Sequence, residues 1–462
     1  MPWSSTDAGA SVLREDTASA GALLQGARVV LAAGGGAGSA RESLRRLALK
    51  AVRAHFTRNS AQFREADAEG LPAAVCALIE GSDTEEAENC EAALVAMATA
   101  GEGELLADLL GDSSPLVALA MGGAAGSTAR VRALSAAVAC GEVSARGGEA
   151  LRSSSALGVI KASVGACGDL LERLNGVELL ARIADGAAAE ACGADVAEAL
   201  LPLIEGSAGA EAGDMVLSPI VATAACRAAR AAPPAAGERL VRAVVALAHG
   251  AAEGGDPSLE ASARDALSHA PVELVFACED AAKELCSAAL GVLARRPLEE
   301  PRLAAAHALA TLAGATDSAA AAEAEVLSDA TETALKAAFE GAVGELPTPG
   351  VGPALWWLIN QAPAGGDGAA QRAGAYRLVR ALARRQWGAR ACFSSSQLLE
   401  ALGSRAHDAS GAAAAERVHA ADALRHAGAA AGATDEALIA LGPTGGRIER
   451  PVAIPEVATA TR

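Results

Sequence analysis

Aromatic residues are nearly absent from this sequence. Only 2% of its 462 residues are aromatic, although 52% are hydrophobic. The hydrophobic half is mostly Ala, Leu and Val, and Ala and Leu are among the best helix formers. A sheet would favour more β-branched and aromatic residues. The composition therefore predicts a helical protein with a core of small and medium side chains.

Positive charge is also scarce. The chain has 38 Lys and Arg against 56 Asp and Glu, which gives a formal net charge of −18. Nucleic-acid binding needs a concentrated basic face that neutralises phosphates, and an anionic membrane surface likewise attracts basic segments. Long apolar runs are missing too, since no stretch of about 18 apolar residues is free of Gly and charge. Neither nucleic acid nor a membrane is expected as a partner.

Cysteine pairs of the CxxC type do not occur. The nine cysteines are scattered, and most of them lie in Ala- and Leu-rich segments, such as those around Cys140 and Cys226. This pattern predicts small, buried, reduced side chains; a disulfide framework or a zinc site is the alternative. The first residues lack the basic-then-apolar order of a signal peptide, so the expected location is the cytoplasm or the nucleus.

A regular repeat is what the sequence does contain. Similar amphipathic segments recur along the chain, and those that follow one another directly begin 42 to 44 residues apart. They begin at residues 127, 170, 214, 256, 300, 371 and 413. Second helical segments separate them, for example 195–206 and 238–250. A period in the low forties made of two helices is typical of HEAT and armadillo units, so the predicted fold is an all-α solenoid of HEAT/armadillo-like repeats.

The repeat predicts three regions. Residues 1–66 are N-terminal helices and a Gly-rich linker, 67–440 form the solenoid, and 441–462 are a C-terminal tail. Only 316–370 is out of register with the repeat. Its piece rich in Pro and Gly, at 345–353, is predicted to be a long turn.

Periodicity within the segments supports helices. Between residues 170 and 184, apolar residues recur at helical rather than alternating spacing, as Leu171, Leu174, Val177 and Ile183 show. This spacing supports the assignment of helical repeats.

A two-sided helix is predicted between Asp367 and Glu400, which have no acidic residue between them. Its apolar side is formed by Ala375, Leu378, Ala381 and Leu382. Arg377, Arg380 and Arg384 line the other side, which is predicted to be exposed to solvent. In an acidic protein this positive stripe is either a solvated polar face or a docking surface that steers an acidic partner.

The few aromatic residues gather near the same helix. Trp356, Trp357, Tyr376, Trp387 and Phe393 fall within about forty residues. Tyr376 and Trp387 are predicted to fill the core. Trp356 and Trp357 are adjacent and cannot both point inward, so Trp356 joins the three arginines as a predicted partner-binding residue.

The Gly-rich segment 28–44 is the part of the sequence that most resembles an enzyme motif. Its Gly34, Gly36 and Ser39 nearly fit the spacing of a dinucleotide-binding turn. No βαβ unit follows it, so a linker between two helices is predicted. The chain has no GxxxxGK[ST], GxSxG or HExxH motif. We therefore expect no enzyme activity, no cofactor and no small-molecule substrate.

Titratable residues give no catalytic or metal pattern. The histidines are isolated; His419 and His426 are seven residues apart, whereas a helical metal site prefers three or four. One acidic cluster is formed by Asp83, Glu85, Glu86, Glu88 and Glu91. Negative charge suits the start of a helix, so this cluster is predicted to be a solvated helix start.

The C-terminal third resembles a known family. Residues 377–424 are similar to the 26S proteasome non-ATPase regulatory subunit 5 family, in which an apolar helix ends in Trp and a Phe-x-Ser step, an acidic residue and an Arg follow. The matching residues are Trp387, Phe393, Ser395, Glu400 and Arg405. The tail is similar as well, through Gly442, Pro443, Pro451 and Val452, and so is the Leu-x-Pro step of Leu217 and Pro219. One departure is Ser396-Gln397, where the family has Pro-Gly.

The resemblance implies a function that periodicity alone cannot name. Members of that family are HEAT-like, non-catalytic chaperones of the proteasome base. They bind the C-terminal region of one AAA ATPase subunit and keep base intermediates off the core particle. A HEAT or armadillo scaffold in another complex, such as a transport, phosphatase or cytoskeletal adaptor, is the alternative.

Overall fold

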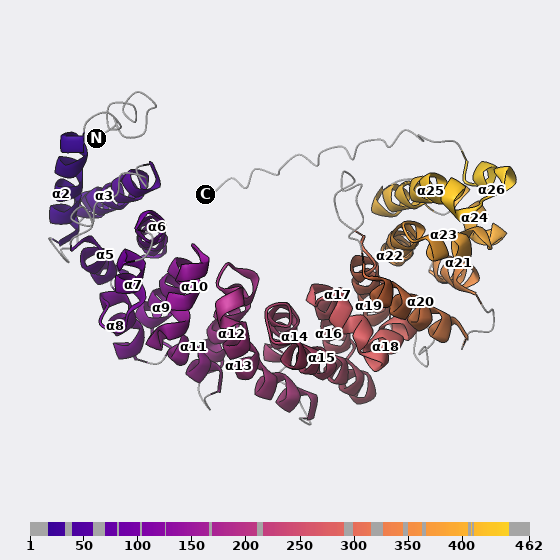
Figure 1. Cartoon of the computed structure of the whole chain (residues 1–462), viewed down its shortest axis with the longest axis horizontal. Helices are drawn as coiled ribbons and strands as arrows, with labels where there is room; N and C mark the ends of the chain where they lie inside the picture. Colours follow the sequence, from indigo (N-terminus) through magenta and orange to yellow (C-terminus); the bar gives the residue numbers. More distant parts are fainter. Residues whose placement is uncertain are drawn as a thin grey trace. The chain divides into compact units, whose positions relative to one another are not determined.

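Helices account for all the regular structure in the described part of the chain (Figure 1). The computed structural model describes residues 17–32, 39–58, 70–80, 83–101, 104–124, 126–165, 169–209, 216–290, 299–315, 327–344, 350–362, 366–404, 408 and 411–442. The fold is an all-α solenoid of armadillo-like repeats, as the sequence predicts.

The chain divides into two compact units. Unit 1 consists of Met1–Gly206 and Val216–Gly237, and unit 2 of Ser207–Met215 and Glu238–Arg462. The sequence-based boundaries at residues 66 and 440 do not coincide with this division. The N-terminal helices belong to unit 1, where they pack on the helices that follow them.

Unit 1 is built from two rows of helices. The first row comprises α2 (Thr17–Ala32), α5 (Leu71–Ile79), α8 (Pro115–Gly122) and α11 (Ser155–Gly165). The second, named the ladder row, comprises α3 (Ser39–Arg58), α6 (Thr84–Ala100), α9 (Thr128–Gly141), α12 (Leu170–Asp185) and α14 (Leu217–Ala228). Within each row every helix packs on the next, and each helix of the first row packs on the ladder-row helix that follows it. Unit 1 also contains α7 (Glu104–Leu110), α10 (Ala145–Ser153) and most of α13 (Ala189–Gly209).

Unit 2 repeats this plan. Its ladder row comprises α16 (Pro257–Ala266), α19 (Glu299–Leu312), α22 (Gly366–Ala383) and α25 (Gly411–Ala431), which pack in that order. The remaining helices are α15 (Pro234–Gly254), most of which lies in this unit, α17 (Val272–Ala277), α18 (Glu279–Ala289), α20 (Asp329–Gly344), α21 (Val351–Gln361), α23 (Gln386–Phe393), α24 (Ser396–Gly403) and α26 (Asp435–Ala440). A short 3-10 turn, Leu267–His269, follows α16.

The predicted repeat corresponds to the two ladder rows. The segments expected at 127, 170, 214, 256, 300, 371 and 413 are the helices α9, α12, α14, α16, α19, α22 and α25. The second helices expected at 195–206 and 238–250 are α13 and α15. Both predictions are confirmed, because a small-residue apolar face recurring every forty-odd residues can be buried only against its neighbours.

Capping residues set where several helices begin. The side chains of Asp83, Ser114, Ser127 and Asp256 accept hydrogen bonds from backbone N–H groups in the first turns of α6, α8, α9 and α16. An oxygen at this position satisfies a donor that the helix itself leaves unpaired.

The region that is out of register contains two helices, α20 and α21. The long turn predicted at 345–353 is wrong at its C-terminal end, because α21 already begins at Val351. Gly350 precedes it with φ of 120°, a backbone conformation that side-chain-bearing residues rarely adopt. Residues 345–349 lie outside the described part of the chain.

The core is composed of small residues, as predicted. Ala, Leu and Val side chains dominate it. Helix α13 approaches the connection between α14 and α15 so closely that a Cβ atom on Gly193 would lie 2.2 Å from the carbonyl oxygen of Ala231. Eight cysteines are free and buried, which confirms their prediction, while Cys167 lies outside the described residues. Burial raises the pKa of the Cys76, Cys90 and Cys392 thiols to about 12.

Candidate partner-binding surfaces

The predicted arginine stripe lies on α22, between α19 and α25 of the unit 2 ladder row. Arg377 reaches α19, where its Nη1 lies 3.4 Å from His307 Nδ1 and its Nη2 lies 3.3 Å from Thr311 Oγ1. Arg384 donates a hydrogen bond of 2.8 Å to the carbonyl oxygen of Gly314, just after α19. Both side chains are partly exposed.

Arg380 points to the other neighbour, α25. Its Nη1 lies 3.4 Å from Glu416 Oε2 and 3.4 Å from His419 Nδ1. Only 5% of Arg380 is exposed, so the prediction that all three arginines form a solvent-exposed face is wrong at this position. The physical reason is the repeat itself, since a ladder-row helix has neighbours on two sides and a long side chain reaches polar groups across either interface. Burial, followed by the charge of Arg380, lowers the pKa of Arg384.

A buried polar group lies at the start of α22. Arg372 Nε donates to both carboxylate oxygens of Asp408 at 3.0 Å, and Arg372 Nη2 lies 2.9 Å from Asp408 Oδ1. Tyr376 donates its hydroxyl to Asp408 Oδ2 at 3.0 Å. Arg372 and Asp408 are 4% and 5% exposed. Burial, and secondly the Asp408 charge, raise the pKa of Tyr376. The group joins α22 to the segment that precedes α25.

The aromatic residues divide between core and surface. Tyr376 is fully buried, which confirms its prediction, while Trp387 is partly exposed and packs on Phe339 at a ring-centroid distance of 5.9 Å. Trp356 and Trp357 on α21 are both partly exposed, and Arg302 lies 5.2 Å above the ring of Trp357. The binding roles of Arg377, Arg384 and Trp356 therefore stay predictions, and each of these side chains is partly accessible.

The residues of the family resemblance have structural positions around α24. Ser395 is buried and caps this helix, since its Oγ accepts a hydrogen bond of 3.3 Å from Leu398 N. Phe393 ends α23 and is partly exposed, and Glu400 is exposed on α24. Arg405 lies outside the described residues, as do Pro443, Pro451 and Val452.

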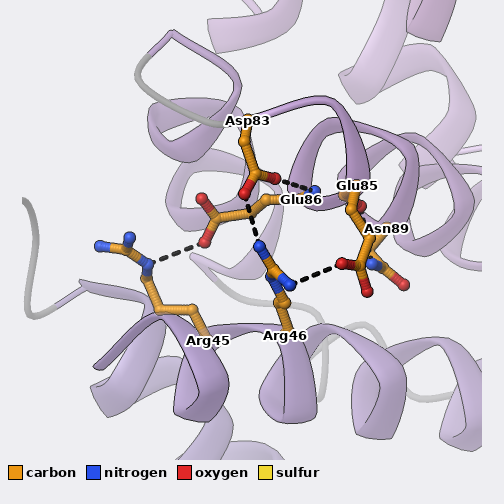
Figure 2. Close-up of polar contacts among 6 residues, drawn as sticks. All are labelled: Arg45, Arg46, Asp83, Glu85, Glu86 and Asn89. Atoms are coloured by element: carbon orange, nitrogen blue, oxygen red, sulfur yellow. Dashed lines mark hydrogen bonds and ion pairs between the residues drawn. The ribbon is translucent and has the colours of Figure 1, made fainter. Parts of the chain in front are cut away.

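The acidic cluster of unit 1 belongs to the interface between α3 and α6. Figure 2 shows Arg45 and Arg46 of α3 reaching the start of α6. Arg45 Nε donates to Glu86 Oε1 at 2.8 Å, and Arg46 pairs with Asp83 and Glu85. Glu86 is only 4% exposed, so the predicted solvated helix start is wrong for this residue. A backbone hydrogen bond from Glu86, aided by Arg46, lowers the pKa of Asp83.

The same kind of pairing continues along the ladder row. Ser135 of α9 donates to Glu91 of α6 at 2.8 Å. Arg182 of α12 lies 3.5 Å from Glu91 and donates to Glu142, just after α9, at 2.8 Å. Asp185 extends the series, because it pairs with Arg227 of α14 at 2.9 Å.

Side chains therefore tie each ladder-row helix of unit 1 to the next. Such cross-links hold neighbouring helices at a fixed spacing, and a row of evenly spaced helices is the extended surface that solenoids use for binding. The pairings were not recognised from the sequence, because partners such as Glu91 and Ser135 are 44 residues apart. That separation equals one repeat, and it is the signal that could have found them.

The ladder contributes a pH dependence through Glu142. Burial raises the pKa of Glu142 above its ordinary 4.5, although Arg182 acts in the opposite direction. As the pH rises above 4.5, the unfolded state releases this proton before the folded state does. The free energy of unfolding of the wild type should therefore fall, relative to Glu142→Gln, as the pH rises through the range above 4.5.

Denaturant unfolding of both proteins at several pH values measures this difference. Glu149→Gln is the matched control, because Glu149 is exposed on α10. The free energy of unfolding of this variant should change with pH as that of the wild type does. If the difference in the free energy of unfolding between the wild type and Glu142→Gln does not change with pH, the Glu142 carboxylate is not desolvated.

Two kinds of feature are absent from the described part of the chain. There, no set of three or more His, Cys, Asp and Glu side chains is arranged to hold a metal ion. No helix formed by the described residues combines the length and hydrophobicity that crossing a membrane requires. Gly34 and Gly36 of the nucleotide-like turn lie outside the described residues, and Ser39 begins α3.

Comparison with known proteins finds only distant structural similarity. No protein-family model matches the sequence, and no curated protein is similar to it. The structure is similar to a crystal structure of an engineered protein from the Northeast Structural Genomics Consortium, with 16% identity, 91% of each chain covered and a TM-score of 0.41. It is also similar to a structure concerned with the phosphorylation switch that controls the interaction between cadherin and beta-catenin. That match has 14% identity, covers 92% of this chain and 89% of the other, and has a TM-score of 0.34.

Proposed function

We propose that this protein is a non-catalytic chaperone for assembly of the 26S proteasome regulatory particle base. In this role it binds an AAA ATPase subunit in the cytoplasm and keeps base intermediates off the core particle. The observation that supports a binding role is the ladder row of each unit. Its successive helices pack on one another, and side-chain pairs such as Arg182–Glu142 and Arg380–Glu416 join neighbouring helices. The resemblance of residues 377–424 supports the particular client.

The ladder rows suit the holding of a folded client. Ion pairs such as Arg182–Glu142 and Arg227–Asp185 fix neighbouring helices before a partner arrives. Binding then costs less conformational entropy, because the surface does not have to be ordered by the partner. Release follows when the client docks elsewhere and the two surfaces compete, so the chaperone needs no cofactor and no ATP of its own.

Affinity purification from the protein's own cells, with mass spectrometry of the recovered proteins, tests the client. Base ATPases and a large base scaffold subunit should be recovered, and core-particle subunits should be absent. The control bait is a variant with Arg377→Glu and Arg384→Glu, the two partly exposed members of the arginine stripe. It should recover fewer ATPases if the stripe steers an acidic surface.

Two other results would contradict the proposal. Recovery of transport, phosphatase or cytoskeletal proteins without ATPases would identify a scaffold of another complex. Recovery of core-particle subunits in the same amounts as the base ATPases would show that the chain does not keep intermediates off the core particle.

A further inference from the structure

Exposed apolar side chains gather along one edge of unit 1. Seven large apolar residues are exposed in the described part of the chain, and four of them lie at the starts of ladder-row helices or at the end of the preceding helix. They are Met121, Leu170, Leu171 and Val216, with exposed fractions of 53%, 39%, 58% and 53%. These four residues are named the α12 edge. Leu171 belongs to the apolar pattern that the sequence shows at 170–184, yet its side chain is exposed.

Ion pairs show that the helix starts at the α12 edge are neighbours. Arg130–Glu172 joins the first turns of α9 and α12, and Arg182–Glu142 joins their ends, so the two helices run parallel. The ends of α12 and α14 are joined in the same way, through Asp185–Arg227. The three first turns are therefore neighbours, in the order in which Figure 1 shows the helices.

Met121 reaches the same edge from the first row. It lies in the last turn of α8, which packs on α9 and is joined to it by a short connection. Within that connection, a Cβ atom on Gly126 would lie 3.4 Å from Asp169 Oδ2, at the start of α12. The connection that follows α8 thus lies beside the start of α12.

One cation at this edge has no acidic partner among the described residues. Arg173, in the first turn of α12, makes no ion pair with any described residue, and its buried Nε has no hydrogen-bond partner there. Its neighbour Arg130 differs, because it lies 3.6 Å from Glu172. The edge therefore offers apolar surface next to a guanidinium that is available to an acid.

Two general effects point to what such an edge binds. Contiguous exposed apolar surface on a protein rimmed by polar residues marks an interaction site. A guanidinium beside that surface favours a carboxylate, to which it can donate two parallel hydrogen bonds. The acidic residues at the start of α12 already have partners within the chain, since Asp169 caps the helix and Glu172 pairs with Arg130.

We propose that the α12 edge docks a segment of another protein that carries apolar side chains next to a carboxylate. Leu171 and Val216 receive the apolar side chains, and Arg173 receives the carboxylate. The proposal does not depend on the proteasome client, because it concerns only the chemistry of the recognised segment.

Peptide selection on the full-length chain tests this proposal. The probe is a phage-displayed library of random peptides, selected on the wild type and counter-selected on Leu171→Asp. Enriched peptides should combine Leu, Ile or Phe with Asp or Glu. Their affinity, measured by fluorescence anisotropy, should fall about tenfold or more in Leu171→Asp and in Arg173→Glu, since tenfold corresponds to the loss of one good contact. Arg173→Lys, which keeps the charge, should lose less.

A matched control separates docking from a general surface effect. Ile439 of unit 2 is 76% exposed, so Ile439→Asp adds the same charge at an unrelated apolar site and should leave the affinity unchanged. Helicity measured by circular dichroism checks that each variant is folded. Enrichment of basic peptides, no enrichment, or an affinity indifferent to Arg173→Glu overturns the proposal. A wild-type dimer that Leu171→Asp dissociates also overturns it, because the occupant would then be a second copy.

Discussion

Asp408→Ala should lower the free energy of unfolding of unit 2 by about 3–5 kcal/mol, which is the usual cost of removing one partner of a buried ion pair. Asp408 accepts three hydrogen bonds within the buried group, two from Arg372 and one from Tyr376. Without the carboxylate, Arg372 remains as a buried charge that is 4% exposed. The desolvation cost of that charge is then no longer offset by its principal acid.

Tryptophan fluorescence during urea unfolding measures this loss. Three of the four tryptophans, at positions 356, 357 and 387, lie in unit 2, so the signal reports chiefly on that unit. Asp422→Ala is the matched control, because it removes a partly exposed pair with Arg425 on α25 and should cost less than about 1 kcal/mol. Tyr376→Phe should fall between the two, at about 1–2 kcal/mol for one buried hydrogen bond. Equal effects of Asp408→Ala and Asp422→Ala would contradict a buried ion pair.

Gly193→Ala is expected to destabilise unit 1 although alanine is the better helix former. A Cβ atom at this position would lie 2.2 Å from the carbonyl oxygen and 2.5 Å from the carbonyl carbon of Ala231. Backbone atoms cannot move aside as a flexible side chain can, so the helix must shift, and overpacking of this kind costs about 1–3 kcal/mol. Hydrogen exchange of the α13 and α14 amides measures the local free energy of opening.

Gly158→Ala provides a control of opposite sign. Gly158 lies on α11 in the same unit, and a Cβ atom there would have no neighbour within 4 Å. This substitution should therefore raise helix stability by about 0.5–1 kcal/mol through its propensity alone. If both substitutions stabilise their helices, the close approach of α13 and Ala231 is not present in solution.

The sequence could predict the fold because the repeat is encoded redundantly. Each ladder-row helix carries its own apolar face and its own spacing, so the segments at 127, 170 and 256 are found independently of one another. The division into two units could not be predicted, since the Gly-rich stretch after residue 206 does not differ from others that mark no division, such as 34–38.

The surfaces were harder to predict because burial of an arginine depends on its neighbours. Arg380 and Arg377 have the same local pattern, yet Arg380 is buried against α25 and Arg377 is partly exposed beside α19. Leu171 shows the reverse case, because its spacing fits the apolar pattern of its helix but it is exposed in the first turn. Periodicity identifies the face of a helix but does not show where along that helix its neighbours end.

The buried thiols of this chain have a consequence for how its motions can be followed. Eight of them are distributed from Cys76 on α5 to Cys392 on α23, so that both units carry several. Reaction with a thiol reagent requires access to the sulfur, and burial withholds that access while a repeat is closed. Each cysteine therefore becomes reactive only when its own part of the solenoid opens. The protein thus carries a built-in series of local reporters, which can show in what order its repeats loosen when a partner binds or leaves.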